Sequence, residues 1–379
     1  MFLGKEELKN IIIILGTRPE AIKLAPVILE LKKWPDKYHV ITCNTGQQKE
    51  MSKQALSFFD LIADINLNVM QPNQTLAGVQ ARILSKLSDV YVHHKIDATI
   101  VQGDTMTVFC GALVSFYNKV PVFHVEAGLR SYDMSEPFPE EAMRQMTTRI
   151  ADLHFVPTEE ARKALLKENI ASHKIVLTGN TVIDALYCLS PGVLQNAERK
   201  LTDKGVHLND KLVLITVHRR ENHGERLDSI LASIVQLAQR FTDHQFVVPV
   251  HPNPNVKDKT HEVLGELPNA VLTQPLDYPE LVSLLRNAKL VLTDSGGIQE
   301  EAPTFGVPVL VMRYETERKE GVVAGYAKLV GADENIIFRE ASDVLLQEKA
   351  KTRLDDRNNP YGNGRAAEKI QESIDYRFR

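Results

Sequence analysis

Short apolar, β-branched runs alternate with amphipathic segments along the whole chain. The runs contain few polar residues, so each predicts a strand buried on both faces. Between them, apolar residues at i, i+3, i+4 and i+7 spacing, as in Leu24, Val27, Ile28 and Leu31, predict helices. The expected strands are 11–15, 40–43, 98–101, 120–125, 153–156 and 175–177 in the first half, and 212–217, 246–250, 270–272, 290–292, 307–312 and 329–330 in the second.

Strands that alternate with helices predict an α/β fold with parallel sheets covered on both faces. About six strands in each half favour two doubly wound domains over one continuous sheet. The linker is expected within 178–192, and a last helix at 365–376. Ligands of such sheets bind beyond the carboxyl ends of the strands, so we expect the site in the cleft between the two domains.

Composition narrows the class of protein. A chain of 379 residues with 43% hydrophobic and 25% charged residues is ordinary for a globular protein and long enough for two cores. A net charge of −4 argues against a nucleic-acid partner. No apolar run approaches the ~18 residues of a membrane span, so we expect no membrane association and a cytoplasmic location.

The most distinctive motif is TDSGGIQEEAP at 293–303, directly after an expected strand. It predicts a sharp strand-to-helix turn at Ser295, Gly296 and Gly297. Unpaired N–H groups and the helix dipole at such a turn suit a diphosphate. Glu301, one turn into the helix, is placed to accept hydrogen bonds from a sugar hydroxyl. The alternative is a well-capped helix without a ligand.

Carboxylates also follow expected strands. Asp104 comes after 98–101, Glu126 comes directly after 120–125, and Glu140 lies in a proline-stiffened loop. Three carboxylates that converge from separate strand ends are typical of a site that exchanges protons near neutral pH. The alternative for each is a helix cap or a salt bridge.

Cations and histidines occupy the same kind of position. Arg18 and Lys23 follow the first expected strand and suit carboxylate or phosphate, unless they are simply solvated. His218 follows 212–217 beside two arginines, where it suits a phosphate donor or an acid/base group. His251 repeats that placement one strand later, either as a ligand contact or in shaping its loop, and Arg318 adds a cation near the diphosphate turn.

Several motifs are missing from the sequence. No GxGxxG follows the first expected strand and no GxxxxGK[ST] occurs, so neither a nicotinamide turn nor a P-loop is predicted. There is no metal-ligand triad, and we expect no metal and no cofactor. The remaining set of groups predicts a nucleotide-sugar enzyme that works by proton transfer with a diphosphate leaving group.

Together these motifs resemble the non-hydrolysing UDP-N-acetylglucosamine 2-epimerases, in order and over nearly the whole chain. The matching segments are GTRPEAIK at 16–23, HVEAGLR at 124–130, PFPEE at 137–141, TGNTVID at 178–184, HRREN at 218–222, HPNP at 251–254, DSGGIQEEAP at 294–303 and NPYG at 359–362.

The resemblance implies a GT-B architecture with Rossmann-like domains at 1–181 and 182–361 and a helix, 362–379, that crosses back to the first. It implies reversible C2 epimerisation of UDP-GlcNAc to UDP-ManNAc through elimination of UDP to 2-acetamidoglucal and re-addition. That reaction would supply ManNAc-type sugars for cell-surface polysaccharides, and we expect a homodimer. By motif, the catalytic candidates are Asp104, Glu126, Glu140 and His218, and the substrate and UDP contacts are Arg18, Lys23, Ser295, Gly296, Glu301 and Arg318.

Three other functions stay open at this point. A hydrolysing epimerase would release ManNAc and UDP after the same elimination. A GT-B glycosyltransferase has the same architecture but needs an acceptor groove and has less use for three carboxylates. A nucleotide-sugar-binding regulator would have no need of the acid/base set.

Overall fold

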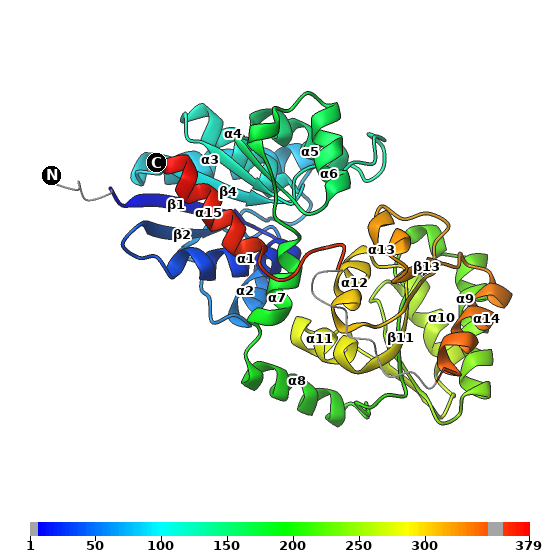
Figure 1. Cartoon of the computed structure of the whole chain (residues 1–379). Coiled ribbons are helices and arrows are strands. Elements are labelled where there is room, and N and C mark those ends of the chain that lie inside the picture. The colour runs from blue at the N-terminus through cyan, green and yellow to red at the C-terminus, as the bar shows by residue number, and fades with distance from the viewer. Residues whose placement is uncertain (1–6, 348–358) are drawn as a thin grey trace. The chain divides into compact units, whose positions relative to one another are not determined.

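The computed structural model describes residues 7–347 and 359–379. These fall into two compact units, one within Met1–Cys188 and Gly362–Arg379, the other within Leu189–Tyr361. Each unit is a parallel sheet flanked by helices (Figure 1). None of the helices in the described part of the chain has the length and apolar content that a membrane crossing requires.

The first unit contains a seven-stranded parallel sheet in the order β3-β2-β1-β4-β5-β6-β7. Its strands are β1 (Lys9–Leu15), β2 (Tyr38–Asn44), β3 (Ile65–Asn66), β4 (Ala98–Gln102), β5 (Val122–Val125), β6 (Leu153–Val156) and β7 (Ile175–Leu177). Its helices are α1 (Arg18–Lys32), α2 (Lys49–Ser57), α3 (Leu76–His93), α4 (Met106–Tyr117), α5 (Glu140–Ile150), α6 (Glu159–Lys167), α7 (Thr181–Cys188) and α15 (Ala366–Phe378), with a 3₁₀ turn at Ser172–Lys174.

The second unit contains a six-stranded parallel sheet in the order β10-β9-β8-β11-β12-β13. Its strands are β8 (Leu212–Thr216), β9 (Gln245–Pro249), β10 (Ala270–Thr273), β11 (Ala288–Thr293), β12 (Val309–Val311) and β13 (Ala327–Leu329). Its helices are α8 (Pro191–Asp203), α9 (Glu225–Arg240), α10 (Pro254–Leu264), α11 (Tyr278–Asn287), α12 (Gly296–Glu301), α13 (Lys319–Val323) and α14 (Glu334–Leu345), with 3₁₀ turns at Arg220–Asn222 and Ala302–Phe305.

Burial on both faces explains why the strands read as continuous apolar runs. In β11, Leu290 and Leu292 pack into one hydrophobic cluster, whereas Val291 packs into another on the opposite face. All three side chains are inaccessible to solvent. The same holds for β1, where all five residues of the predicted strand are fully buried. All twelve strands that the sequence predicts are therefore present, with ends shifted by a few residues.

Strand β3 was not predicted. It has only two residues, Ile65 and Asn66, and it pairs with the end of β2 at the sheet edge. Ile65 is only partly buried and Asn66 is exposed, so this segment has no apolar run that would mark it.

Both sheets are doubly wound, and the strand order reverses once in each. The reversal lies between β1 and β4 in the first unit and between β8 and β11 in the second. Two crossovers leave such a point in opposite directions and open a crevice beyond the carboxyl ends of the strands, where ligands of open α/β sheets bind. The fold therefore directs attention to the residues that follow these four strands.

The last helix, α15, packs in the first unit beside α1 and α7 (Figure 1). Asp184 on α7 accepts the backbone N–H of Ala367 at 2.8 Å, and Lys37 forms an ion pair with Asp375 at 2.8 Å. The Asp184 contact ties α7 to α15. The two units divide after Cys188, within the expected linker 178–192 and one helix after the predicted domain limit at residue 181.

Two histidines are buried side by side in the first sheet. His124 on β5 and His154 on β6 are register partners and almost completely buried. The His124 Nε2 atom lies 2.7 Å from the carbonyl of Gly103, whereas neither ring nitrogen of His154 has a partner. Burial lowers the pKa of His124 to about 4 and that of His154 to about 3.

We expect that in His154→Leu the unfolding free energy decreases less steeply with falling pH than in the wild-type protein. Both folded pKa values lie below the ordinary value of ~6.5, so the unfolded chain binds more protons and stability falls as pH drops below about 6.5. Removing one such histidine should remove about 1.4 kcal/mol per pH unit of that slope between about pH 6 and 4. Urea unfolding at several pH values measures it. His261→Leu, at an exposed position on α10, is the control, and equal slopes for the two variants would contradict the prediction.

Candidate active site

The turn between β1 and α1 is fixed by a buried carboxylate. Glu20 accepts the N–H groups of Gly16 at 2.6 Å and Thr17 at 3.2 Å, and the hydroxyl of Thr105 at 2.5 Å. Burial raises the pKa of Glu20. Only glycine fits at position 16, because a Cβ there would lie 2.1 Å from the Thr45 hydroxyl. This turn presents Arg18, half-buried, as the first residue of α1.

Glu126 lies directly after β5 and is held by three neighbours. Its Oε1 atom accepts from the Lys23 ammonium group and from the Asn180 amide at 3.3 Å, and its Oε2 atom accepts from the Gln102 amide. The side chain is 7% exposed and that of Lys23 is 13% exposed, so this ion pair is largely shielded from solvent. The backbone of Glu126 has φ of 61°, a left-handed conformation that is costly for a residue with a side chain.

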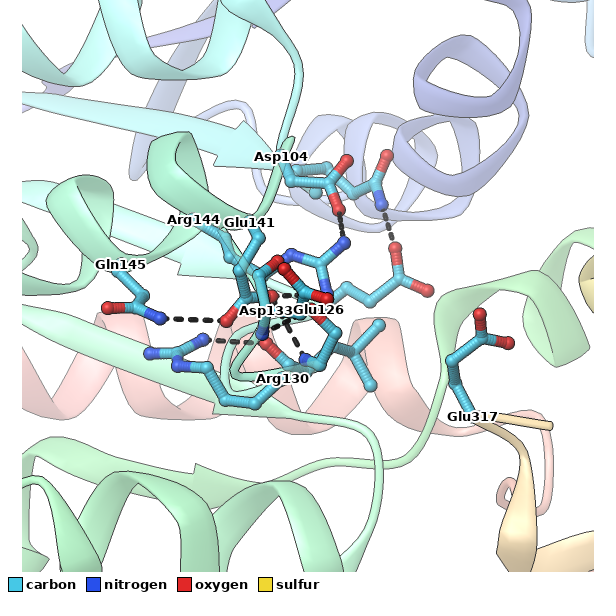
Figure 2. Close-up of polar contacts among 12 residues, drawn as sticks. Asp104, Glu126, Arg130, Asp133, Glu141, Arg144, Gln145 and Glu317 are labelled. Carbon is cyan, nitrogen blue, oxygen red and sulfur yellow. Dashed lines mark hydrogen bonds and ion pairs between the residues drawn. The ribbon is translucent and has the colours of Figure 1, made fainter. Parts of the chain in front are cut away.

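Asp104 lies after β4, the strand next to β5, and is paired with a cation. Its Oδ2 atom accepts from Arg144 on α5 at 2.5 Å. The Arg144 guanidinium also lies 3.3 Å from Glu141. Figure 2 shows Arg144 between the carboxylates of Asp104 and Glu141, with Glu126 nearby.

The adjacent glutamates at the start of α5 have different environments. Glu141 is fully buried and accepts the N–H groups of Ser131 and Tyr132 at 3.0 and 3.1 Å. Burial alone would raise the pKa of Glu141, but these donors and Arg144 hold it below its ordinary value. Glu140 is half-buried at the first position of the helix. Glu141 therefore anchors the preceding loop, and Glu140 keeps a carboxylate accessible to solvent.

In the second unit, His218 follows β8 and is bound to a buried carboxylate. Its Nδ1 atom lies 2.9 Å from Oδ1 of Asp294, the residue that follows β11. Asp294 is fully buried, and it also accepts the backbone N–H groups of His218 and Arg219 at 3.0 and 2.9 Å. His251, which follows β9, stacks on the His218 ring with centroids 5.9 Å apart. Burial and the neighbouring His218 lower the pKa of His251.

In the turn from β11 into α12, Gly296 lies against the guanidinium of Arg318. A Cβ on Gly296 would lie 2.9 Å from Cζ of Arg318, whereas a Cβ on Gly297 would meet nothing within 4 Å. Arg318 donates through Nε to Glu300 at 2.9 Å. Ser295 is the N-cap residue of α12, and its side chain makes no capping hydrogen bond. Its backbone N–H donates to the Thr293 hydroxyl at 2.9 Å.

Glu301 ends α12 and is 6% exposed. Within residues 7–347 and 359–379, no three His, Cys, Asp or Glu side chains are grouped in a way that would hold a metal ion. What each unit offers is hydrogen-bonding and acid/base chemistry. The first unit presents carboxylates held by cations. The second presents a carboxylate-bound histidine and a guanidinium that lies against Gly296.

Comparison with known proteins places the chain in a family. The family model described as UDP-N-acetylglucosamine 2-epimerase matches residues 30–375. The chain belongs to this family. It is 43% identical over 371 residues to the UDP-N-acetylglucosamine 2-epimerase of Neisseria meningitidis serogroup A. The aligned region covers 96% of this chain and 99% of the relative. The predicted family is confirmed.

Solved structures confirm the fold class. The crystal structure of UDP-GlcNAc 2-epimerase from Neisseria meningitidis bound to UDP-GlcNAc matches with a TM-score of 0.86 at 42% identity, covering 97% of this chain and 100% of that one. Sucrose-phosphate synthase from Thermosynechococcus elongatus matches in fold, with a TM-score of 0.63 at 13% identity, covering 98% and 99% of the two chains. This member of the epimerase family is an α/β protein with a GT-B-like fold.

The predicted site residues of this chain form two sets, one in each unit. Members of each set follow the strands at the reversal or the next strand of the sheet. The first set comprises Arg18, Lys23, Asp104, Glu126 and Glu140. The second comprises His218, His251, Ser295, Gly296, Gly297, Glu301 and Arg318.

The ammonium group of Lys23 is bound to Glu126, a partner that the sequence analysis did not identify, and its predicted contact with the substrate stays a prediction. The sequence analysis also missed the groups that hold the carboxylates and the histidine in place. These are Gln102, Glu141, Arg144, Asn180 and Asp294. Arg144 had a detectable signal, since it lies one helical turn after Glu140 and so shares its face of α5.

Proposed function

We propose that this protein interconverts UDP-GlcNAc and UDP-ManNAc by inverting the configuration at C2, as a UDP-N-acetylglucosamine 2-epimerase of the isomerase class. The observation that carries the proposal is the intact acid/base set of Asp104, Glu126, Glu140 and His218 in a chain that is 43% identical over its length to such an enzyme. Two of the three carboxylates are paired with cations, and the histidine is bound to a carboxylate.

The proposed reaction proceeds in two balanced steps. A base removes the proton from C2, the C–H electron pair forms the C1–C2 double bond, and the C1–O bond breaks with its electrons moving to UDP. The products are 2-acetamidoglucal and UDP. UDP then adds back at C1 while an acid delivers a proton to the opposite face of C2. Proton transfer of this kind by positioned side chains accelerates a step by roughly 10²–10⁴-fold.

We assign proton transfer at the sugar to Asp104, Glu126 and Glu140. The surroundings of two of these residues support the assignment, because Lys23 and Arg144 bind Glu126 and Asp104. These ion pairs hold the two carboxylates in fixed positions, and proton transfer to or from a substrate requires a positioned side chain. Lys23 then contributes through Glu126 as well as through any contact with the substrate.

We assign the diphosphate to the turn at Ser295, Gly296 and Gly297, with Arg318 as the cation and His218 as the proton donor to the leaving oxygen. The close approach of the Arg318 guanidinium to Gly296 supports this, since a planar fork beside open backbone suits phosphate oxygens. We assign Arg18, His251 and Glu301 to binding the substrate. A homodimer, a cytoplasmic location and a role in supplying ManNAc-type sugars for cell-surface polysaccharides stay predictions.

The test is incubation with UDP-GlcNAc in D2O in the presence of EDTA, followed by NMR. We expect UDP-ManNAc to form with deuterium at C2 and without added cofactor, since elimination requires exchange of that proton. Unlabelled product would contradict the proposed elimination, and loss of turnover in EDTA that a divalent ion restores would contradict metal-free chemistry. Release of free ManNAc would identify the hydrolysing reaction, and transfer of the sugar to an added acceptor would identify a glycosyltransferase.

A further inference from the structure

We propose that Asp294 is a positioning residue that fixes the tautomer and orientation of the His218 imidazole. The inference rests on the proposed function, in which His218 handles a proton at the diphosphate. The observation that carries it is the contact between Nδ1 of His218 and Oδ1 of Asp294 at 2.9 Å, inside the second unit.

Asp294 is itself held firmly. Besides the ring, it accepts the backbone N–H of His218 at 3.0 Å, that of Arg219 at 2.9 Å and the side-chain amide of Asn222 at 3.1 Å. The carboxylate is fully buried. Burial alone would raise the pKa of Asp294, but His218 and the backbone donors hold it below its ordinary value. The group is therefore a fixed anion with its acceptor sites occupied by donors.

A fixed anion dictates which ring nitrogen carries the proton. An ionised carboxylate only accepts hydrogen bonds, so Nδ1 of His218 must be the protonated nitrogen of the neutral ring. The opposite nitrogen, Nε2, is then the one that gains and loses the proton during the reaction. His251 stacks on the ring at an interplanar angle of 27°, which limits its rotation from a second direction. The His218 side chain remains 36% exposed, so the ring is accessible to a ligand.

Asp294 also joins two parts of the proposed site. It lies at the end of β11, immediately before Ser295 and Gly296 of the diphosphate turn, and it holds the loop that follows β8. The position of the His218 ring is thus set relative to the turn that we assign to the diphosphate. A side chain that only stabilised the loop would need the backbone N–H contacts but not the contact to the ring.

The wild-type protein gives the first test. With ¹⁵N-labelled histidine, and with His218→Asn to assign its signals, NMR of the neutral ring reports which nitrogen is protonated. We expect protonation at Nδ1. A neutral His218 ring that carries its proton on Nε2 would overturn the proposal, whether or not any variant folds. This readout does not depend on turnover, so it stands apart from the test of the proposed function.

The second test is Asp294→Asn, alone and combined with His218→Asn. The asparagine keeps an oxygen for the backbone donors but offers an amide that can donate to Nδ1, so we expect a shift toward the Nε2-protonated ring. Turnover should fall ~10- to 100-fold, with a smaller change in KM. In the His218→Asn background the same change should have little further effect, because Asp294 acts through His218. Equal losses in both backgrounds would indicate a purely structural role and overturn the proposal.

Asn222→Ala is the matched control for the NMR measurement. It removes one donor to Asp294 and a tie to the carbonyl of Met312, at 3.1 Å each, but leaves the contact to the ring intact. We expect the His218 signals to keep the wild-type pattern of protonation. A shift as large as that in Asp294→Asn would show that loosening the loop is sufficient to change the tautomer, which contradicts a specific role for the carboxylate.

Discussion

Replacing Asp104 by asparagine, Glu126 by glutamine, Glu140 by glutamine or His218 by asparagine should each lower turnover by ~100-fold or more. The three carboxylate changes keep the size of the side chain, and His218→Asn replaces the ring by a smaller polar amide. Each removes the group that accepts or donates a proton. The loss should appear mainly in kcat, because these groups act on the reacting atoms. Steady-state rates with UDP-GlcNAc measure it, and circular dichroism checks that each variant is folded.

Glu160→Gln is the matched control for Glu140→Gln. Glu160, like Glu140, is in the first turn of its helix, but it is exposed and pairs with Lys163 at 2.6 Å on the surface. It should retain wild-type turnover, since exposed ion pairs of this kind contribute little. Near-wild-type turnover in any two of the four site variants would mean that the catalytic set is wrongly assigned.

The fold could be predicted because its main signal is local in the sequence. Ile11 to Ile14 and Leu290 to Leu292 are apolar at consecutive positions and are all fully buried. In β11, alternate side chains enter hydrophobic clusters on opposite faces of the sheet. Such runs are typical of parallel strands buried on both faces. The two-residue strand β3 could not be predicted, because Ile65 and Asn66 form too short a segment to show any periodicity.

The site was predictable to the extent that it follows strands. Asp104, Glu126 and His218 were found because polar residues immediately after buried strands stand out in the sequence, and doubly wound sheets gather ligands there. Which partner each of them meets could not be found in this way, although Asp294 also follows a buried strand. Arg144 lies 40 residues after Asp104, and Asp294 lies 76 residues after His218, so only the folded chain shows that they meet.

The ion pair between Lys23 and Glu126 illustrates the same limit more sharply. The two residues are 103 positions apart, and each alone suited a substrate contact or a catalytic role. The fold brings the ends of β1 and β5 close enough for the two charges to pair in a largely buried place. A residue type near a strand end therefore predicts that a charge reaches the site, but not which charge it meets there.

Gly296→Ala should weaken UDP binding about 10-fold or more while leaving the fold intact. The new methyl group would lie 2.9 Å from Cζ of Arg318, so something must move. What moves is the end of a long side chain, which costs the folded protein little. The guanidinium would leave its position against the turn that we assign to the diphosphate. A charge-assisted contact to an anion is worth about 1.5–3 kcal/mol, which corresponds to a loss of at least about 10-fold in affinity.

Gly297→Ala is the matched comparison, because it adds the same methyl group to the same proposed diphosphate turn but meets no protein atom within 4 Å and so leaves Arg318 in place. Both changes replace glycine by alanine in α12, so their effects on helix propensity largely cancel. Backbone N–H groups are kept in both. Calorimetric titration with UDP compares the two Kd values, and thermal melting compares stability. We expect Gly296→Ala to bind UDP about 10-fold or more weakly than Gly297→Ala at similar Tm. Equal Kd values would show that the place of the Arg318 guanidinium beside Gly296 does not matter for the diphosphate.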